Sequence, residues 1–224
     1  MAPSPPRPPV IAILGDIVRS KRLPGIQRGD VQVRLDNVLA RINERYESAV
    51  LGQFLITLGD EFQGILHNPA VVPDIVQDIR EELPTISFRI AVSLGEITTG
   101  IKTTAIGTDG PAWYAARALL DEWRRGKREG VAFTGFGVDD LVLNGGSGLL
   151  TYHWTHLEAS QREIINALRH HEGLRKQAAA DMKISQQALS NRAQTAGWRE
   201  YEAGMRALRD ILSRHAPPHA PPVA

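Results

Sequence analysis

The first strong pattern along the chain is a short continuous run of apolar residues at 10–14, which predicts a buried central strand. Gly15 and Asp16 follow directly, so this strand would carry the Asp16 carboxylate at its C-terminal end. Apolar residues then recur at helical spacing over residues 28–48, which predicts one long amphipathic helix.

A second acidic position lies between two further apolar runs, at 53–58 and 62–66. The short Gly-Asp connection around Asp60 predicts a β-hairpin. The order of strands and helices indicates an α+β, ferredoxin-like palm with helices packed on one face of the sheet. The same patterns predict helices at 72–83 and 111–125, and strands at 86–94, 97–106 and 131–134.

The C-terminal part has a different, purely helical pattern. Ser160 and Glu163 have the spacing of a capping box, which predicts the start of a helix. Two short helices, one at 176–181 and one capped by Ser185, are separated by a three-residue turn. This pattern predicts a small all-α helix-turn-helix domain, with a further helix at 201–214 that closes the bundle or pairs two subunits.

Composition sets the outer limits of these predictions. The 224 residues are 42% hydrophobic and 23% charged, as in ordinary globular proteins, and contain no cysteine. No apolar run reaches 18 residues and the N-terminus lacks a signal-peptide core, which predicts a cytoplasmic protein without membrane insertion. The expected organisation is a disordered Pro-rich tail at 1–9, a palm domain at 10–155, a helix-turn-helix domain at 156–215 and a disordered tail at 216–224.

The two aspartates suggest a metal site. If the strand of Asp16 neighbours the hairpin of Asp60, both carboxylates project from the same sheet edge. Close carboxylates repel each other and need a cation, and oxygen ligands favour Mg²⁺ or Mn²⁺. A metal held in this way suits the phosphates of a nucleoside triphosphate. The alternative for Asp60 is ordinary turn chemistry.

Several short motifs carry a family resemblance. Residues 15–20, Gly-Asp-Ile-Val-Arg-Ser, resemble the first metal motif of class III nucleotidyl cyclases, and residues 58–62, Leu-Gly-Asp-Glu-Phe, resemble the second and the signature turn of diguanylate cyclases. Residues 89–97 resemble the cyclase strand that follows, and 115–119 the helix behind the active site. Over residues 10–213 the chain is more similar still to the SatD family, which combines such a palm with a helix-turn-helix.

The resemblance assigns roles to individual residues. It implies that Asp16 and Asp60 bind the metal and that Arg117 stabilises charge on the phosphate, while active sites formed between two subunits imply a homodimer. Two cyclase positions differ: Trp113 replaces an Asn that orients the ribose, and Ile56 replaces a Lys that reads adenine. Arg19, Lys21 and Arg22 directly follow Asp16, where they either hold triphosphate oxygens or form a solvated loop. The predicted nucleotide-binding residues are Ile17, Arg19, Lys21, Arg22 and Trp113.

Other interpretations of these residues stay open. Glu61 is either a further acidic ligand or, as we favour here, a solvated hairpin residue. Arg117 can instead pair with Asp121 one helical turn away. Trp113 has the helical spacing of a core residue, and the sequence does not indicate which face of its strand Arg89 uses.

The polar side of the last short helix suggests contact with double-stranded DNA. Gln and Asn side chains can read adenine edges in the major groove, while basic residues contact phosphates. The alternative is a helical bundle used for packing or dimerisation, since this part has only a mild excess of basic residues. The predicted DNA-binding residues are Lys183, Gln186, Gln187, Ser190, Asn191 and Arg192.

Three hypotheses for function follow. The first is a metal-dependent nucleotide-binding protein coupled to a DNA-binding helix-turn-helix, acting as a nucleotide-responsive regulator. The second is an active nucleotidyl cyclase that makes a cyclic nucleotide from an NTP. The third is a degenerate palm that acts as a partner-binding scaffold.

Overall fold

The computed structural model describes residues 8–20 and 24–217. It divides into two compact units, the first comprising residues 1–147 and 208–224 and the second residues 148–207. The predicted tails lie largely outside the described residues, as do Lys21 and Arg22. Within the described part, no helix combines the length and apolar character needed to cross a membrane.

The first unit is built on a five-stranded mixed sheet with the strand order β2-β3-β1-β4-β5. The central strand β1 pairs antiparallel with both β3 and β4, and β5 adds to β4 in parallel. A mixed α+β fold was predicted, and this sheet confirms it at that level. The strands are β1 (Val10–Ile17), β2 (Val50–Leu58), β3 (Glu61–Leu66), β4 (Phe88–Gly95) and β5 (Gly130–Thr134).

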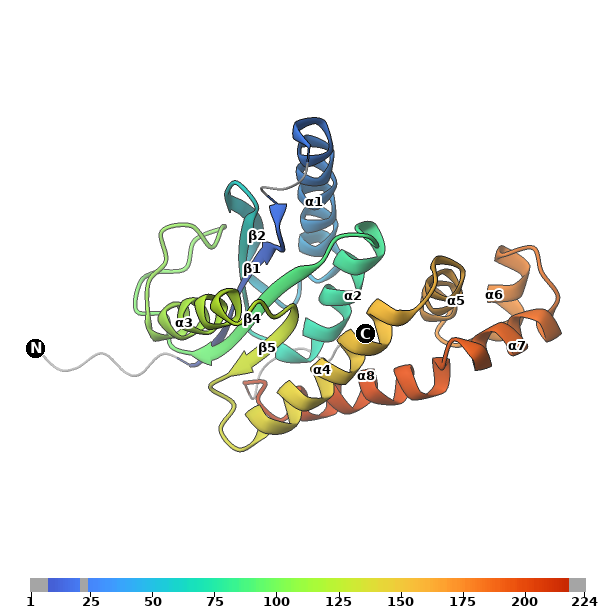
Figure 1. Ribbon diagram of the computed structural model, residues 1–224. Helices are drawn as coiled ribbons and strands as arrows, with labels where there is room; N and C mark the ends of the chain where they lie inside the picture. Colours follow the sequence, from blue (N-terminus) through green and yellow to red (C-terminus); the bar gives the residue numbers. More distant parts are fainter. Residues whose placement is uncertain (1–7, 21–23, 218–224) are drawn as a thin grey trace, which may run out of the picture. The chain divides into compact units, whose positions relative to one another are not determined.

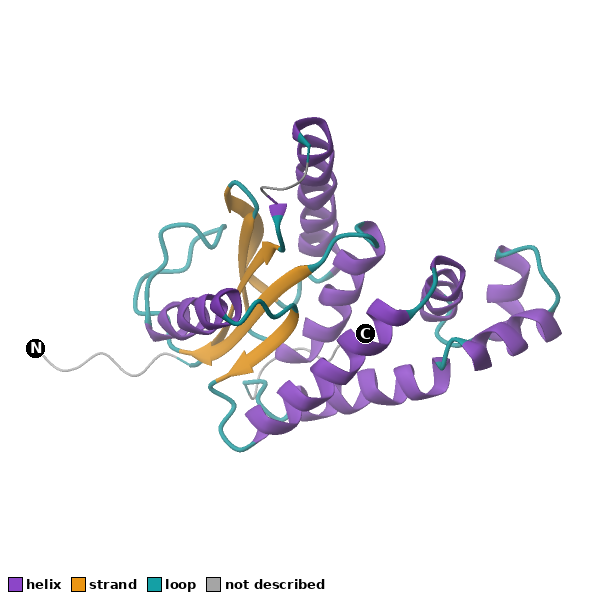
Figure 2. Ribbon diagram, viewed as in Figure 1, coloured by secondary structure: helices purple, strands orange, loops and turns teal. Residues whose placement is uncertain are grey.

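Helices cover both faces of this sheet, whereas the sequence predicted helices on one face only. Figures 1 and 2 show α3 (Pro111–Arg125) on one face, with α1 (Gly25–Arg45) and α2 (Val72–Glu82) on the other. Strand β1 is buried on both sides, as its uninterrupted apolar sequence requires. Trp113, Ala116 and Leu120 of α3 pack over alternate residues of β1.

Close packing fixes the register of β1 against β3. Gly15 lies directly opposite Phe62, and a β-carbon at Gly15 would overlap the Phe62 ring. Asp16 is therefore held opposite Glu61. The two-residue turn Gly59–Asp60 closes the hairpin, and Gly59 takes the positive φ that such turns require.

The predicted strand at 97–106 is wrong. This segment is a loop that touches the sheet at one isolated bridge, between Gln53 and Thr104. The register of β2 shifts repeatedly along β3, so β2 does not offer a regular edge on which another strand could continue.

Helix α4 (Asp139–His156) was not predicted, and its first half protects the edge strand β5. The Asn144 side chain accepts a hydrogen bond from the Phe133 N–H and donates one to the Phe133 carbonyl, both at 2.9 Å. The Ser147 hydroxyl donates to the Val131 carbonyl at 2.9 Å. These contacts satisfy backbone groups that an exposed sheet edge would leave open to other chains.

The second unit is helical. The predicted Ser160 capping box is replaced by one with Glu158 as the N-cap and Gln161 at the third position, because the helix begins two residues earlier. The Ser185 side chain caps its helix, as predicted, and accepts from Ala188 N–H at 3.1 Å. Its helices are α5 (Ala159–His170), α6 (Arg175–Asp181) and α7 (Gln186–Thr195), together with the second half of α4 and the first half of α8 (Trp198–Ser213).

The boundaries of the units differ from the predicted domain boundaries. The end of α8 belongs to the first unit, where Arg209 forms two hydrogen bonds of 2.8 Å with Asp74. His215 lies 2.8 Å from Asp139 in the same unit. Residues 208–215 therefore pack with the sheet-bearing unit rather than with the helical one.

Candidate functional site

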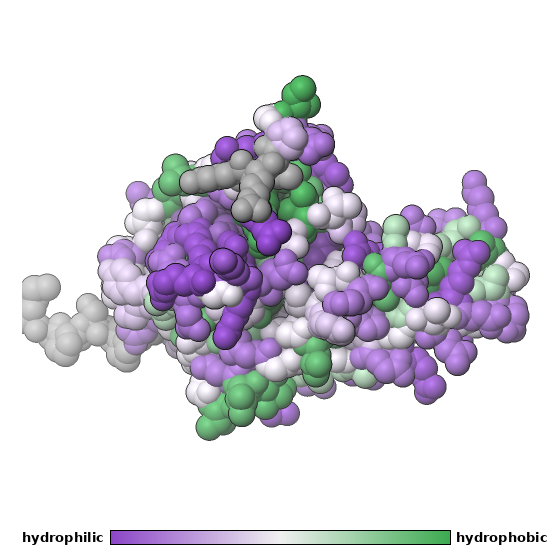
Figure 3. Space-filling model, viewed as in Figure 1, coloured by the Kyte–Doolittle hydropathy of each residue, from purple (hydrophilic) through white to green (hydrophobic). Residues whose placement is uncertain are grey.

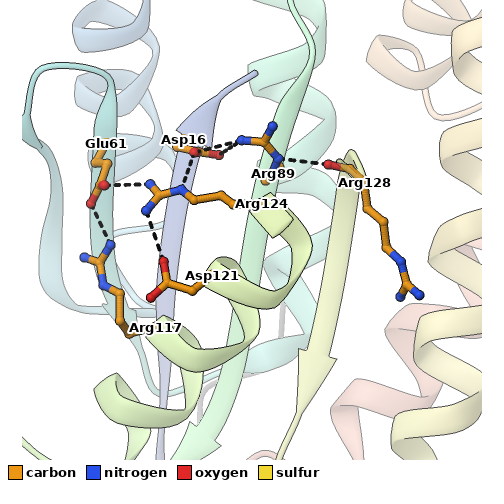
Figure 4. Close-up of polar contacts among 7 residues, drawn as sticks. All are labelled: Asp16, Glu61, Arg89, Arg117, Asp121, Arg124 and Arg128. Atoms are coloured by element: carbon orange, nitrogen blue, oxygen red, sulfur yellow. Dashed lines mark hydrogen bonds and ion pairs between the residues drawn. The ribbon is translucent and has the colours of Figure 1, made fainter. Parts of the chain in front are cut away.

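Three strands place charged side chains in one row at the end of the sheet. Asp16 of β1 is the register partner of Glu61 on β3 and of Arg89 on β4. Register partners project to the same face of a sheet, here the face that α3 covers. Figure 4 shows these side chains together with Arg117, Asp121 and Arg124 of α3, and we call the six residues the carboxylate–arginine cluster.

Asp16 is buried, and both of its carboxylate oxygens accept hydrogen bonds. Arg89 Nη1 lies 3.3 Å from Oδ1 and 3.0 Å from Oδ2, while Arg124 Nε lies 2.8 Å from Oδ2. Arg89 Nε also donates to the Arg128 carbonyl at 2.9 Å, which fixes the plane of its guanidinium group. The charge of Asp16 is thus compensated by two arginines from two different elements.

Arg124 links three carboxylates. Its Nε donates to Asp16, its Nη2 to Glu61 at 2.6 Å and its Nη1 to Asp121 at 3.2 Å. Arg117, Asp121 and Arg124 are spaced along one face of α3, as four- and three-residue steps require. Partial burial lowers the pKa of Arg124, but its hydrogen bonds to Asp16 and Glu61 outweigh that effect and raise the pKa above its usual value.

Glu61 is a member of the cluster and not the solvated hairpin residue that we favoured from the sequence. Its Oε2 accepts from Arg117 Nη1 at 2.9 Å, and only 18% of its side chain is exposed. Burial raises the pKa of Glu61, but the hydrogen bonds from Arg124 and Arg117 outweigh it and hold the pKa below its ordinary value. The alternative Arg117–Asp121 pair is replaced by Arg117–Glu61 and Arg124–Asp121.

A cavity of about 980 Å³ lies beside the cluster and shares Arg89 with it. Among the described residues that line it, Arg19, Lys127 and Arg128 are further cations and Glu129 is an acid. Trp123 supplies an aromatic wall. Figure 3 shows strongly hydrophilic side chains gathered over α3 on the visible face. We call this space the cationic cavity, and its remaining lining residues are Val18, Thr85, Ile86 and Ser87.

Two of these cationic residues have an unusual backbone conformation. Arg19 (φ 59°) and Lys127 (φ 53°) both take the left-handed conformation that favours glycine. Lys127 follows the last turn of α3, where the Arg128 N–H bonds the Trp123 carbonyl at 3.0 Å and the Lys127 N–H bonds the Arg124 carbonyl at 3.2 Å. This arrangement is a Schellman motif, whose left-handed position is usually glycine. A lysine there costs about 1 kcal/mol relative to glycine.

The residues predicted for the nucleotide site are not all brought together. Arg117 joins the cluster and Arg19 lines the cavity. Ile17 is buried, and Trp113 packs in the core with its Nε1 donating to Thr108 Oγ1 at 2.8 Å. Asp60 lies in the hairpin turn and, among the described residues, pairs with no arginine of the cluster.

The predicted Mg²⁺ or Mn²⁺ ion does not fit this arrangement. Of the two predicted ligands, Asp16 has its oxygens engaged by guanidinium groups, as has its neighbour Glu61, and a divalent cation would have to displace them. Asp60, the other predicted ligand, is not a member of the cluster. Within the described residues, no group of three or more histidine or acidic side chains is placed to hold a metal ion. The metal remains an implication of the sequence resemblance.

Sequence reasoning missed Arg124, Lys127 and Arg128 and left Arg89 unassigned. The spacing of Arg117, Asp121 and Arg124 was a usable signal, since steps of four and three residues place all three on one face of α3, next to its buried residues. No comparable signal marks Arg128, which enters through its carbonyl and its place beside the cavity.

The residues predicted for DNA contact lie on α7 and in the turn before it. Leu189 and Ala193 form the buried side of α7, and the polar residues lie away from it. Gln187 Nε2 donates to Asn191 Oδ1 at 3.0 Å, and Arg175 Nη1 donates to Ser190 Oγ at 3.3 Å. The exposed members of the predicted set are Lys183, Gln186, Gln187, Asn191 and Arg192, while Ser190 is half-buried.

The fold and this site describe a mixed α+β protein with a charged cluster at one end of its sheet. The model of the SatD family matches residues 10–212. The chain belongs to the SatD family. Among curated proteins, none matches it.

Solved structures similar to this chain include nucleotidyl cyclases, each with 19% identity. A bacterial light-regulated adenylyl cyclase matches with a TM-score of 0.44 over 58% of this chain and 44% of its own, so less than half of that structure is spanned. The catalytic core of a rhodopsin–guanylyl cyclase with converted specificity, in complex with ATPαS, matches with a TM-score of 0.41 over 57% and 77%. The monomeric guanylyl cyclase domain of the RhoGC fusion protein from the aquatic fungus Blastocladiella emersonii matches with a TM-score of 0.37 over 57% and 81%.

Proposed function

We propose that this protein binds a nucleoside triphosphate or a related nucleotide at the Asp16 end of its sheet, with the phosphates in the cationic cavity. The observation that carries the proposal is the cavity itself, in which Arg19, Arg89, Lys127 and Arg128 face one acid. Guanidinium and ammonium groups are the side chains best suited to phosphate oxygens.

The size and wall of the cavity support a ligand larger than a free phosphate. Its volume of about 980 Å³ is at the upper end of the range for small-molecule sites, roughly 300–1,000 Å³. Trp123 offers an aromatic face to a base or another ring. Because Arg89 is already compensated by Asp16, the excess positive charge comes from Arg19, Lys127 and Arg128.

Binding without turnover is the form of the proposal that we favour, which makes the protein a nucleotide-responsive regulator. In the cyclase resemblance an Asn orients the ribose, and the matching Trp113 is only 8% exposed and bonded to Thr108. Arg117, matched to the residue that stabilises charge on the phosphate, is held by Glu61. An active nucleotidyl cyclase is the second candidate, and formation of a cyclic nucleotide from any NTP would establish it.

For the second unit, the proposal is binding of double-stranded DNA by the exposed polar side of α7. Support comes from Gln186, Gln187 and Asn191, which are exposed while Leu189 is fully buried beneath them. Arg192→Gln is expected to weaken binding of genomic DNA fragments at low salt, whereas Arg199→Gln, an exposed arginine on α8, is the matched control. Fluorescence anisotropy measures both, and equal affinities for the two variants would reject this role for α7.

A homodimer is also part of the proposal, as the cyclase resemblance implies. Val138, just before α4, and Leu141 in its first turn are 91% and 82% exposed, and Figure 3 shows an apolar patch over this segment. Light scattering on the wild type and on Leu141→Asp tests it: a dimer that the substitution dissociates would place the contact here, and a wild-type monomer would exclude the dimer.

Nucleotide binding is tested by calorimetric titration of ATP, GTP, CTP and UTP. The wild type is expected to bind at least one of them, and Arg128→Gln to weaken that binding about tenfold, the order of one charge-assisted contact. Arg125→Gln removes the same charge from an exposed position three residues earlier and should leave the affinity unchanged. Absence of binding by the wild type, or equal losses in both variants, would overturn the proposal.

A further inference from the structure

We propose that Arg89 and Arg124 occupy the place beside Asp16 where the family resemblance implies a divalent cation shared with Asp60, so that this site binds nucleotide phosphates without a metal ion. The nucleotide half of this inference rests on the proposed function. The metal half rests on the carboxylate–arginine cluster alone and is tested separately.

The first argument is charge balance. The cluster contains three carboxylates, Asp16, Glu61 and Asp121, and three guanidinium groups, Arg89, Arg117 and Arg124. Every carboxylate in it accepts from at least one arginine, at donor–acceptor distances between 2.6 and 3.3 Å. Carboxylates crowded in a half-buried place need compensating positive charge, and here arginine side chains supply it.

The second argument is the cost of exchange. The side chains of Asp16 and Arg89 are only 6% and 12% exposed, so a metal ion that displaced Arg89 would leave a guanidinium group poorly solvated and unpaired. Arg124 would lose its bonds to Asp16 and Glu61 at the same time. A doubly charged cation would also lie among three guanidinium groups that repel it. The loss of ion pairs by the arginines and their repulsion of the cation therefore both disfavour a metal ion in the cluster.

The third argument is that the same arginines can still contact a phosphate. A guanidinium group has five N–H donors, and Arg124 engages its three nitrogens with one carboxylate each. Donors on its two terminal nitrogens remain for a ligand, and 32% of its side chain is exposed. Arg117 is 43% exposed and, within the described residues, bonds Glu61 through Nη1. Arg89 lines the cationic cavity itself, and the side chains of Arg124 and Arg117 can hold phosphate oxygens that extend from the cavity over the cluster while they compensate the carboxylates.

The first test compares nucleotide affinity in EDTA with that in saturating Mg²⁺, using the wild-type protein and the nucleotide that binds best. The expected result is an affinity that Mg²⁺ leaves unchanged or weakens, because the metal neutralises the phosphates that the arginines attract. A tenfold or greater tightening by Mg²⁺ would overturn the inference. If no nucleotide binds in either condition, the proposed function fails, and the metal half is decided by the second test.

The second test is a titration of Mn²⁺ without nucleotide, followed by electron paramagnetic resonance of the free ion. The wild type is expected to show no saturable site. Saturable binding that Asp16→Asn abolishes would overturn the inference. Arg124→Gln takes one guanidinium group from Asp16 and Glu61 and is expected to create Mn²⁺ binding, whereas the matched Arg125→Gln is not. If the folded Arg124→Gln variant does not bind Mn²⁺, the proposal that Arg124 occupies the place of the cation is contradicted. If that variant does not fold, the wild-type titration decides whether the site binds a metal ion.

Discussion

The carboxylate–arginine cluster and the polar side of α7 are both rich in functional groups, but they differ in what holds them. In the cluster, side chains from β1, β3, β4 and α3 bond one another, and Asp16 is almost fully buried. On α7 the polar residues belong to one helix and are largely exposed above Leu189. The fold requires the cluster residues, whereas it tolerates many side chains on the outside of α7.

This difference determines how a substitution can be interpreted. A change in the cluster alters both stability and binding, because the same bonds serve the fold and the ligand. A change on the outside of α7 leaves stability alone, so any effect on binding reports directly on function. The predictions below use stability measurements to separate the two regions.

The largest effect is expected for Asp16→Asn. Loss of this charge leaves Arg89 and Arg124 without their shared partner in a buried place and should lower the free energy of unfolding by about 3 kcal/mol. Asp121→Asn, where 42% of the side chain is exposed, should lower it by less than about 1 kcal/mol. Urea denaturation of both variants measures this contrast, and equal losses would refute the picture of a buried central charge.

A comparable effect in the second unit should come from its core and not from its polar side. Leu189 is fully buried, so Leu189→Ala is expected to lower the free energy of unfolding of this unit by about 3 kcal/mol. Hydrogen exchange of the α6 and α7 amides would locate the loss. A variant as stable as the wild type would mean that α7 does not pack as described.

A smaller effect concerns the acid stability of the first unit. The folded-state pKa of Glu61 lies below its ordinary value of 4.5, so its ionised form contributes stability that is fully present above pH 4.5. This contribution is lost as the pH falls below 4.5 through the lowered pKa. Glu61→Gln should therefore show a shallower decline of stability than the wild type over that acidic range, measured by urea denaturation at a series of pH values. Parallel declines would contradict the ion pairs with Arg117 and Arg124.

Lys127→Gly is expected to raise stability by about 1 kcal/mol while it weakens nucleotide binding, because glycine relieves the left-handed backbone and removes one charge from the cavity. Lys127→Ala removes the same charge and keeps a β-carbon, so it should weaken binding without the gain in stability. Thermal denaturation together with calorimetry checks both variants. A gain in stability in both Lys127→Gly and Lys127→Ala would show that the gain does not come from relief of the left-handed backbone.

The smallest effect is expected on the outside of α7. Arg192→Gln should change the free energy of unfolding by no more than about 0.5 kcal/mol, since Arg192 is exposed. Urea denaturation provides the measurement. A loss of stability above about 1 kcal/mol would mean that α7 packs through its polar side. The DNA affinity of Arg192→Gln would then no longer report on DNA contact alone.

Much of the fold follows from periodicity, where apolar residues are confined to one side of an element. Helices α1, α2 and α3 were predicted in this way, and the strands of the sheet were predicted from short apolar runs. Helix α4 was not, because Leu141, Val142 and Leu143 place apolar residues on several sides and glycines interrupt the pattern. Its position depends on the Asn144 and Ser147 bonds to β5, which no local pattern reveals.

Of the site, the sequence predicted the acidic end together with Arg117 and Arg19, but not the other basic residues. Asp16 and the hairpin stood out because each follows a strong apolar run. The partners of Asp16 could not be predicted, since Arg124 lies 108 residues away along the chain and approaches only when α3 packs on the sheet. Glu61 was misjudged because a hairpin residue can face either side until the register is known.

The close contact of Gly15 with Phe62 has a consequence for how relatives of this chain can vary. The ring occupies the space that any side chain at position 15 would need, and Phe62 is fully buried and cannot move aside. The two positions should therefore change together in the SatD family, with a residue larger than glycine at position 15 accompanied by one smaller than phenylalanine at position 62. Gly64 and Phe54 have the same geometry and should form a second covarying pair.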